Sequence, residues 1–401
     1  MLLSYCTNVH PAEDLDGVID QLVTYAVPVR ESAGLEVLGV GLWMPAVLAH
    51  RLDASAEDRD RLRAVLAEHR LQVHTLNAFP YGGFHRDVVK LDVYTPTWAE
   101  PERLDYTLAC ARVLADLLPD GVDGSISTLP LGWRTSWTTA DDAAAQRAFA
   151  SLSRELKQLE DVTGRVVRIA IEPEPGCILD DVEDVVTWLE SRIGVAQDDG
   201  AHRIDPAFIG VCLDTCHLAV SFADQRAGTG ATVRRITDAG LRVVKVQASA
   251  ALHIADPGTG AARRAIEAFA ETRYVHQVRE LTPAGEVLKS DDLPQALGGA
   301  RSPTDPRLHG EPLPAQGPWR VHFHVPLHHE PAAPLAATTD VLRDAVATVR
   351  AAPRGDEAHL DVETYTWAVL PEAAESLADG IAAELRWARS NLLEEPKEIT
   401  S

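Results

Sequence analysis

Short apolar runs alternate with longer amphipathic segments along most of this chain. The apolar runs lie at about residues 2–9, 35–43, 71–77, 124–129, 166–172, 209–214, 241–247 and 359–363. Runs of this kind are typical of strands buried in a parallel sheet, and the segments between them are typical of helices. Eight strands that alternate with helices predict βαβ units, and they favour a closed (β/α)8 TIM barrel over an open parallel sheet.

One region interrupts this alternation. More than a hundred residues separate the runs at 241–247 and 359–363, with a predicted hairpin at 274–288. Long loops in compact proteins are usually functional, so we expect residues 248–330 to form a lid inserted after strand 7. We therefore predict a single TIM-barrel domain over residues 1–393 and a flexible tail over 394–401.

Four of the apolar runs end in an oxygen-bearing side chain, namely Glu172, Asp214, Gln247 and Glu363. Parallel strands of a barrel present their carboxyl ends at one mouth, where barrel enzymes keep their active sites. Crowded carboxylates repel one another unless a cation neutralises them. The sequence therefore predicts a divalent metal (Mn, Zn or Mg) held by these four residues.

Each of these residues has a simpler alternative role. Glu172 is also suited to be a surface charge or a helix cap, and Asp214 to be the N-cap of the helix that follows it. Gln247 is a weaker metal ligand than a carboxylate, and its amide suits substrate orientation equally well. Glu363 has the alternative of a charge at the rim of the barrel.

Several histidines are further candidates. His322 and His324 alternate on a strand-like segment, so both point to one side and form a plausible metal-binding pair. The alternative is a solvated histidine-rich segment, since His328 and His329 follow closely. His217 comes three residues after Asp214, which lets both side chains reach one pocket.

A second group of residues follows the early strands. His10, His74 and Asn77 lie at or near strand ends, and Trp133 follows the fourth strand. We expect these four to line the far side of the mouth and to contact a substrate. The alternative is that each is a hydrogen-bonded polar group or a packed rim residue.

Composition narrows the classes of partner. The chain has 60 acidic and 37 basic residues, a net charge of −23, which opposes binding to nucleic acid or anionic membranes. No apolar stretch is long enough for a membrane span, and the N-terminus lacks the features of a signal peptide. Five scattered cysteines predict reduced thiols and a cytoplasmic protein. No dinucleotide, P-loop or GxSxG motif is present.

Three motifs resemble a known superfamily. Ile171-Glu172-Pro173, Leu213-Asp214-Thr215-Cys216-His217 and the terminal Glu363 resemble the xylose-isomerase-like barrels, which include sugar isomerases, epimerases and endonuclease IV-type repair enzymes. Within that superfamily, residues 5–11, 75–85 and 124–133 resemble the metabolite traffic protein EboE family.

The resemblance implies a metal held by acids of strands 5, 6 and 8, at Glu172, Asp214 and Glu363. It places Gln247 where histidine is usual, and it places His322 and His324 at an Asp-x-His pair of endonuclease-like members. It also implies that His217 contacts the substrate or the metal.

These observations predict a metal-dependent isomerase- or epimerase-like enzyme for a small sugar, polyol or cyclitol-like metabolite. Glu172 and Glu363 are the expected acid and base, because two carboxylates across a substrate can relay a proton. The alternatives are a non-catalytic metabolite-binding barrel and a metal-dependent phosphoester hydrolase. The expected partners are a small metabolite and other proteins of the same metabolite pathway.

Overall fold

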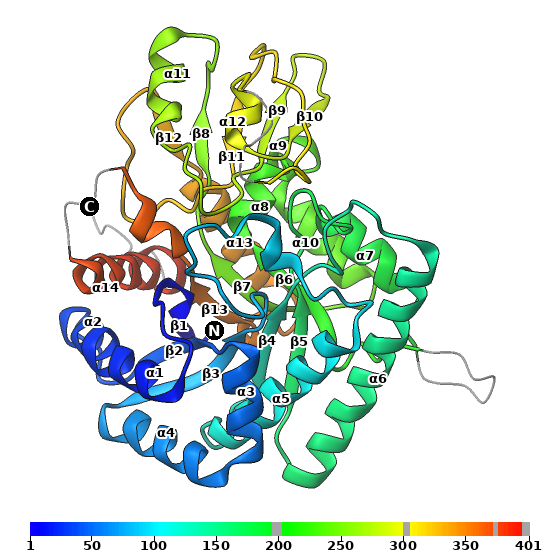
Figure 1. The fold of residues 1–401 in the computed structure, drawn as a ribbon, viewed down its shortest axis with the longest axis vertical. Coiled ribbons are helices and arrows are strands. Elements are labelled where there is room, and N and C mark those ends of the chain that lie inside the picture. The colour runs from blue at the N-terminus through cyan, green and yellow to red at the C-terminus, as the bar shows by residue number, and fades with distance from the viewer. Residues whose placement is uncertain (195–202, 300–304, 372–375, 395–401) are drawn as a thin grey trace, which may run out of the picture.

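Eight parallel strands form a closed barrel at the centre of the computed structural model, which describes residues 1–194, 203–299, 305–371 and 376–394 (Figure 1). The strands are β1 (Leu3–Cys6), β2 (Leu38–Trp43), β3 (Leu71–Asn77), β4 (Gly124–Thr128), β5 (Val167–Ile171), β6 (Ile209–Asp214), β7 (Val243–Ala248) and β13 (His359–Val362). They pair in chain order, and β13 closes the ring by pairing in parallel with both β7 and β1. The predicted TIM barrel is confirmed.

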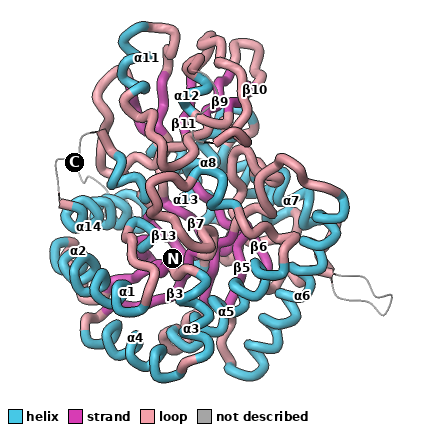
Figure 2. Tube along the Cα trace, in the orientation of Figure 1, coloured by secondary structure: helices cyan, strands magenta, loops and turns pink. Residues whose placement is uncertain are grey.

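Helices surround the strands (Figure 2). They are α1 (Leu15–Gln21), α2 (Val27–Ser32), α3 (Ala46–Ala54), α4 (Ala56–Glu68), α5 (Pro101–Leu117), α6 (Thr139–Thr163), α7 (Val182–Glu190), α8 (Thr215–Val220), α9 (Ala223–Arg226), α10 (Thr229–Asp238), α13 (Thr339–Ala351) and α14 (Leu377–Ala388). Capping boxes begin α6 and α7, because the Thr138 and Asp181 side chains accept backbone N–H groups of the first turn. Among the described residues, no helix has the length and apolar character that a membrane span requires.

A second, antiparallel sheet extends from the carboxyl end of β7. Its strands, in spatial order, are β10 (Val287–Ser290), β9 (Val278–Leu281), β11 (Trp319–Val321), β8 (Leu252–Ile254) and β12 (Leu335–Ala337). The short helices α11 (Gly260–Glu267) and α12 (Leu293–Ala296) accompany it. We call the described residues between 252 and 337 the cap. The predicted hairpin within 274–288 is confirmed as β9 and β10, whereas the rest of this sheet was not predicted.

The cap has a hydrophobic core of its own. Trp319, Val278, Leu252 and Phe323 pack together in a cluster that is separate from the barrel core. In Figure 1 the cap stands beside the mouth of the barrel, next to α8 and the end of β7. The lid over 248–330 and the single domain over 1–393 stay predictions, and the predicted tail lies outside the described residues apart from Glu394.

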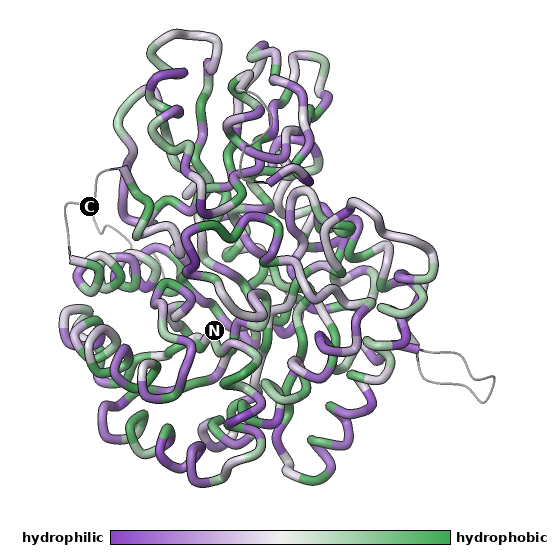
Figure 3. Tube along the Cα trace, viewed as in Figure 1, coloured by the Kyte–Doolittle hydropathy of each residue, from purple (hydrophilic) through white to green (hydrophobic). Residues whose placement is uncertain are grey.

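The polarity of the chain follows this architecture. Hydrophobic positions follow the barrel strands, and the outer helices α4 and α6 carry hydrophilic positions interspersed with hydrophobic ones (Figure 3). The barrel interior is not wholly apolar, however. Lys245 of β7 forms a fully buried ion pair with Asp361 of β13 (Nζ to Oδ2, 2.9 Å), and Ser4 donates to the same carboxylate (2.7 Å).

Candidate active site and metal centre

Three acidic side chains meet where their strands end. Glu172 directly follows β5, Asp214 ends β6, and Glu363 directly follows β13. One carboxylate oxygen of each lies within 4.8 Å of the others, and all three residues are buried. Buried carboxylates so close together cannot all be charged without a compensating cation.

The pKa values reflect this crowding. Burial raises the pKa of Glu172 well above its usual range, and the charges of Glu363 and Asp214 raise it further. Burial and then the charge of Asp214 raise the pKa of Glu363 to about 8, although the amides of Asn8 and Asn77 both donate to its Oε1 (2.6 and 2.8 Å). Without a cation, the site therefore retains protons at neutral pH.

Two histidines are held in one tautomer by carbonyl oxygens. His217 Nδ1 lies 2.7 Å from the carbonyl oxygen of Pro173, and His324 Nδ1 lies 2.7 Å from the carbonyl oxygen of Glu363. A carbonyl oxygen only accepts, so each Nδ1 carries a proton and donates it. In the neutral rings, the lone pair is therefore on Nε2, as it is in most histidine ligands of metals.

His322 is oriented in the same way by a side chain. Its Nδ1 lies 2.7 Å from Oε1 of Gln277, whose Nε2 donates to the carbonyl oxygen of Pro175 (2.8 Å). The Nε2 atoms of His322 and His217 then face each other at 3.1 Å, each with a lone pair in the neutral state. Two lone pairs at this distance repel unless a cation or a proton lies between them. Burial lowers the pKa of His322 well below its usual range, and the charge of His217 lowers it further, which disfavours the proton.

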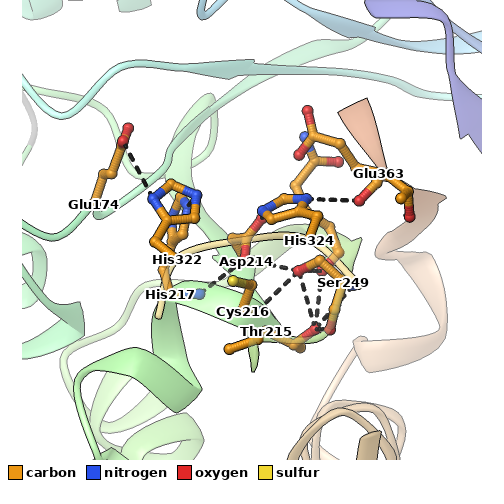
Figure 4. A network of polar contacts seen from close by, with 12 residues as sticks. Glu174, Asp214, Thr215, Cys216, His217, Ser249, His322, His324 and Glu363 are labelled. Atoms are coloured by element: carbon orange, nitrogen blue, oxygen red, sulfur yellow. Dashed lines mark hydrogen bonds and ion pairs between the residues drawn. The ribbon is translucent and has the colours of Figure 1, made fainter. Parts of the chain in front are cut away.

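Several buried polar atoms around these groups lack partners. Asp214 Oδ2, Glu172 Oε2, His324 Nε2 and both amide atoms of Gln247 have no hydrogen-bond partner among the described residues. His324 Nε2 lies 3.8 Å from Asp214 Oδ2 (Figure 4). Unpartnered buried polar atoms are costly, and their convergence is typical of a site that binds a ligand or an ion.

The donors fall into two adjoining groups. The first contains only oxygen donors, from Glu172, Asp214 and Glu363. The second is rich in nitrogen, because His217 has donor atoms within 4.8 Å of His322 and Glu174, and also of His324 and Asp214. Carboxylate oxygens with imidazole nitrogens suit Zn²⁺ or Mn²⁺. The residues present therefore fit a divalent metal.

A pocket opens above these groups. It encloses about 540 Å³, its opening included, and Asn77 and His217 line it together with Glu172, Glu363, His322 and His324. Six of the residues predicted from sequence thus line the pocket, and Asp214, which meets Glu172 and Glu363, lies next to it without lining it. Gln247 is buried on β7, paired in register with Asp214 on β6, and does not line the pocket.

Three predicted substrate contacts lie away from this pocket. The His10 ring stacks on Tyr25 (4.5 Å between ring centres) beside α1, and His74 packs edge-on against His359 deeper in the barrel. Trp133 packs behind Tyr94 (5.1 Å), which itself lines the pocket. We therefore leave His10, His74 and Trp133 out of the proposed site.

Sequence reasoning missed other residues of the pocket. Glu174 accepts hydrogen bonds from Tyr94 and from Gln277, and it lines the pocket beside His322. Its signal was visible, since it follows Glu172 by two positions in Glu-Pro-Glu-Pro. Gln277 and Tyr274 come from the cap, and no sequence signal placed them at the mouth.

One comparison with known proteins, a match to a family sequence model, covers more than half of the chain. A sequence model described as "Xylose isomerase-like TIM barrel" matches residues 29–285. The chain is similar to a solved D-allulose 3-epimerase from Methylomonas sp. (14% identity over 62% of this chain and 72% of that one, TM-score 0.38). It is also similar to an L-ribulose 3-epimerase (13% identity over 68% of this chain and 80% of that one, TM-score 0.39). A third similar structure is the IOLI protein with a binding zinc atom (14% identity over 58% of this chain and 70% of that one, TM-score 0.34). Comparison with curated proteins gives no significant match.

Proposed function

Because the chain belongs to the xylose isomerase-like TIM barrel family, we propose that it is a divalent-metal-dependent isomerase- or epimerase-like enzyme. Its substrate in this proposal is a small sugar, polyol or cyclitol-like metabolite. The narrower relationship to the metabolite traffic protein EboE family, and a place among proteins of one metabolite pathway, belong to the same proposal. They rest on residues 5–11, 75–85 and 124–133.

One observation carries the proposal. The Nδ1 atoms of His217, His322 and His324 all donate to oxygen atoms, so each Nε2 is left with a lone pair. His217 and His324 also have donor atoms close to Asp214, whose Oδ2 is unpartnered among the described residues. Such outer hydrogen bonds are the usual means of orienting histidine ligands. The metal would be held within the two adjoining groups of donors, which come from Glu172, Asp214, Glu363, His217, His322 and His324. Gln247 is paired in register with Asp214 on the neighbouring strand.

The roles of the acids follow from their partners. A bound cation would polarise a carbonyl or hydroxyl of the substrate. Glu363 is held by two amide donors on Oε1, which fixes the direction in which its carboxyl group can give or take a proton. Glu172 has its Oε2 unpartnered among the described residues, so that atom is free to exchange a proton with the substrate.

Metal content tests the proposal directly. Protein purified with Mn²⁺ or Zn²⁺ is expected to hold at least one ion per chain by elemental analysis. Asp214→Asn should lower that content severalfold, because it keeps the Oδ1 acceptor for His217 N–H and replaces the free oxygen by an amide. Asp344→Asn, at an exposed position of α13, is the matched control. A metal-free wild-type protein under these conditions would contradict the proposal.

Proton exchange separates catalysis from binding. With free ketoses in D₂O, the metal-loaded enzyme is expected to incorporate deuterium at the carbon beside the carbonyl group, as followed by ¹H NMR. Glu172→Gln and Glu363→Gln should each abolish this exchange. A metal-loaded protein that binds these ketoses without any exchange would instead be a metabolite-binding barrel.

The nitrogen-rich group of donors supports a second candidate function, phosphoester hydrolysis. Histidine-rich metal sites also serve phosphoester hydrolases. Release of phosphate from p-nitrophenyl phosphate by the metal-loaded protein, lost in His217→Ala, is the result that this alternative requires.

A further inference from the structure

The pocket has a second, apolar end that the proposed chemistry does not use. The rings of Phe84, Tyr274 and Tyr365 contact one another, with ring centres 4.9 to 5.7 Å apart. Val89 belongs to the same hydrophobic cluster, which is separate from the barrel core and from the cap core. All four residues line the pocket. One wall is therefore largely aromatic and apolar, and its side-chain polar atoms are the two tyrosine hydroxyl groups, of which Tyr274 Oη has no hydrogen-bond partner among the described residues.

This wall lies directly beside the metal-binding residues. The Tyr365 ring is 4.7 Å from the His324 ring, measured between centres. A ligand whose oxygens reach His324 and its neighbours thus has its next few atoms against the aromatic rings. One small molecule can therefore contact both ends of the pocket.

The one cationic side chain among the described residues that line the pocket is already neutralised. Lys90 Nζ lies 2.7 Å from Asp292 Oδ2, and it also donates to the carbonyl oxygens of Tyr274 (2.6 Å) and Glu271 (3.4 Å). An ammonium group has three N–H donors, so all of them are used. Lys90 and Asp292 are both buried, and the pair offers no charge to an anionic ligand.

We propose that this site takes an uncharged, amphipathic ligand. It has a hydroxyl- or carbonyl-bearing head that meets the acid and histidine end, and a compact apolar ring that packs on Phe84, Tyr274 and Tyr365. The inference rests on the proposed function, because the head is assigned to the metal. It goes further by ranking two members of that substrate class, the phosphorylated sugars and the sugars that are polar on every side, below ligands with an apolar ring in affinity.

The physical reason is desolvation. A hydroxyl group placed against the faces of the three rings loses its hydrogen bonds to water, and only the two tyrosine hydroxyl groups at the ring edges can replace them. A phosphate group would meet a lysine that has no donor left. An apolar ring that packs on the wall, in contrast, buries apolar surface of both the ligand and the protein, which favours binding through the hydrophobic effect.

A matched pair of diols tests this inference. Binding of 1-phenyl-1,2-ethanediol and of 1,2-ethanediol to the Mn²⁺-loaded protein is compared by calorimetric competition. The two share the same head, so the expected preference of at least tenfold for the phenyl compound reports on the wall alone. Equal affinity, or tighter binding of glycerol 1-phosphate or D-fructose than of the phenyl diol, would overturn the inference.

An isosteric variant locates the preference in the pocket. Val89→Thr replaces a methyl group by a hydroxyl group at a residue of the wall that is 5% exposed. It should reduce affinity for the phenyl diol at least threefold and leave ethanediol binding unchanged. The control is Val182→Thr in α7, a residue 5% exposed that does not line the pocket, and it should change neither affinity.

Metal content is measured in the same samples. A protein that takes up no Mn²⁺ would overturn the proposed function and this inference together. A Mn²⁺-loaded protein without a preference for the phenyl diol would overturn the inference and leave the proposed function standing.

Discussion

Asp214 shows how one residue can satisfy two competing interpretations of its sequence. Its Oδ1 accepts from the His217 backbone N–H (2.9 Å) and from Ser249 Oγ (2.8 Å), so it is the N-cap of α8. Its Oδ2 has no hydrogen-bond partner among the described residues and faces His324. A carboxylate has two oxygens, and the cap role therefore holds the proposed ligand role in place.

The buried His10 gives a prediction about acid stability. Burial lowers the pKa of His10 to about 3, with a smaller contribution from His85. An unfolded histidine titrates near 6.5, so below that pH the unfolded chain binds the extra proton and the folded protein loses stability. His10→Phe keeps a ring stacked on Tyr25 and removes this titrating group. Between pH 7 and pH 5, the variant should therefore lose about 2 kcal/mol less unfolding free energy than the wild type.

Urea unfolding of both proteins at the two pH values measures this difference. The opposite trend, with the variant losing more stability than the wild type on acidification, would contradict the assignment. His50→Phe, on α3 at an exposed position, is the control and should leave the slope unchanged.

At the level of single residues, sequence reasoning located the strand-end acids because a barrel brings strand ends to one mouth. It could not identify which ring nitrogen of His217 carries a proton, because the carbonyl oxygen that decides this belongs to Pro173, 44 positions away. Nor could the sequence show that Asn77 lines the pocket and that His74 does not. Both belong to β3, but His74 lies three residues deeper and meets His359 instead of the pocket.

At the scale of elements, the barrel strands were predictable and the cap strands were not. The bounds of β3 and β6 agree with the apolar runs at 71–77 and 209–214 to the residue. In the cap, β8 and β12 are three residues long and pair across more than 80 positions. A strand of three residues carries too little periodicity to be recognised, and its pairing is decided by tertiary contacts.

Helix α14 depends on a glycine for its packing. A Cβ atom on Gly380 would lie 2.3 Å from the ring of Trp367, whose Nε1 donates to Glu384 one turn further along (3.0 Å). Glu384 also accepts from Thr364, the residue after Glu363 (2.6 Å). Packing of this helix is therefore coupled to the loop that carries a proposed catalytic acid.

We predict that Gly380→Ala lowers the free energy of unfolding by about 1–3 kcal/mol, as overpacked cores usually do. Gly230→Ala in α10 is the matched control, because its Cβ would meet only the flexible end of Arg234. That control is expected to be neutral or slightly stabilising. Chemical denaturation of the two variants measures the contrast, and an equal effect of both substitutions would refute the packing argument.

At the scale of the whole molecule, the cap is the feature that distinguishes this chain from a plain barrel. It has its own hydrophobic cluster, and it contributes Tyr274, Gln277 and His322 to the mouth. We therefore retain the proposal that the inserted segment acts as a lid. Because the cap core is small, its opening should cost less free energy than unfolding of the barrel.

Hydrogen exchange tests this proposal. Amides of β9 and β11 are expected to exchange faster than those of β5 and β6, and addition of Mn²⁺ should slow exchange in the cap more than in β4. Uniform protection across cap and barrel would mean that the two open only together.

The Lys90–Asp292 pair joins the loop after β3 to the cap through two charges without access to water. Loss of one partner strands the other in an apolar surrounding, which typically costs 3–5 kcal/mol, whereas joint replacement by residues of similar volume is often neutral. The interface should therefore tolerate Lys90→Met combined with Asp292→Leu better than Lys90→Met alone. An evolutionary path from the Lys90–Asp292 ion pair to an apolar pair would have to pass through a less stable single substitution. The two residues are therefore hard to replace one at a time.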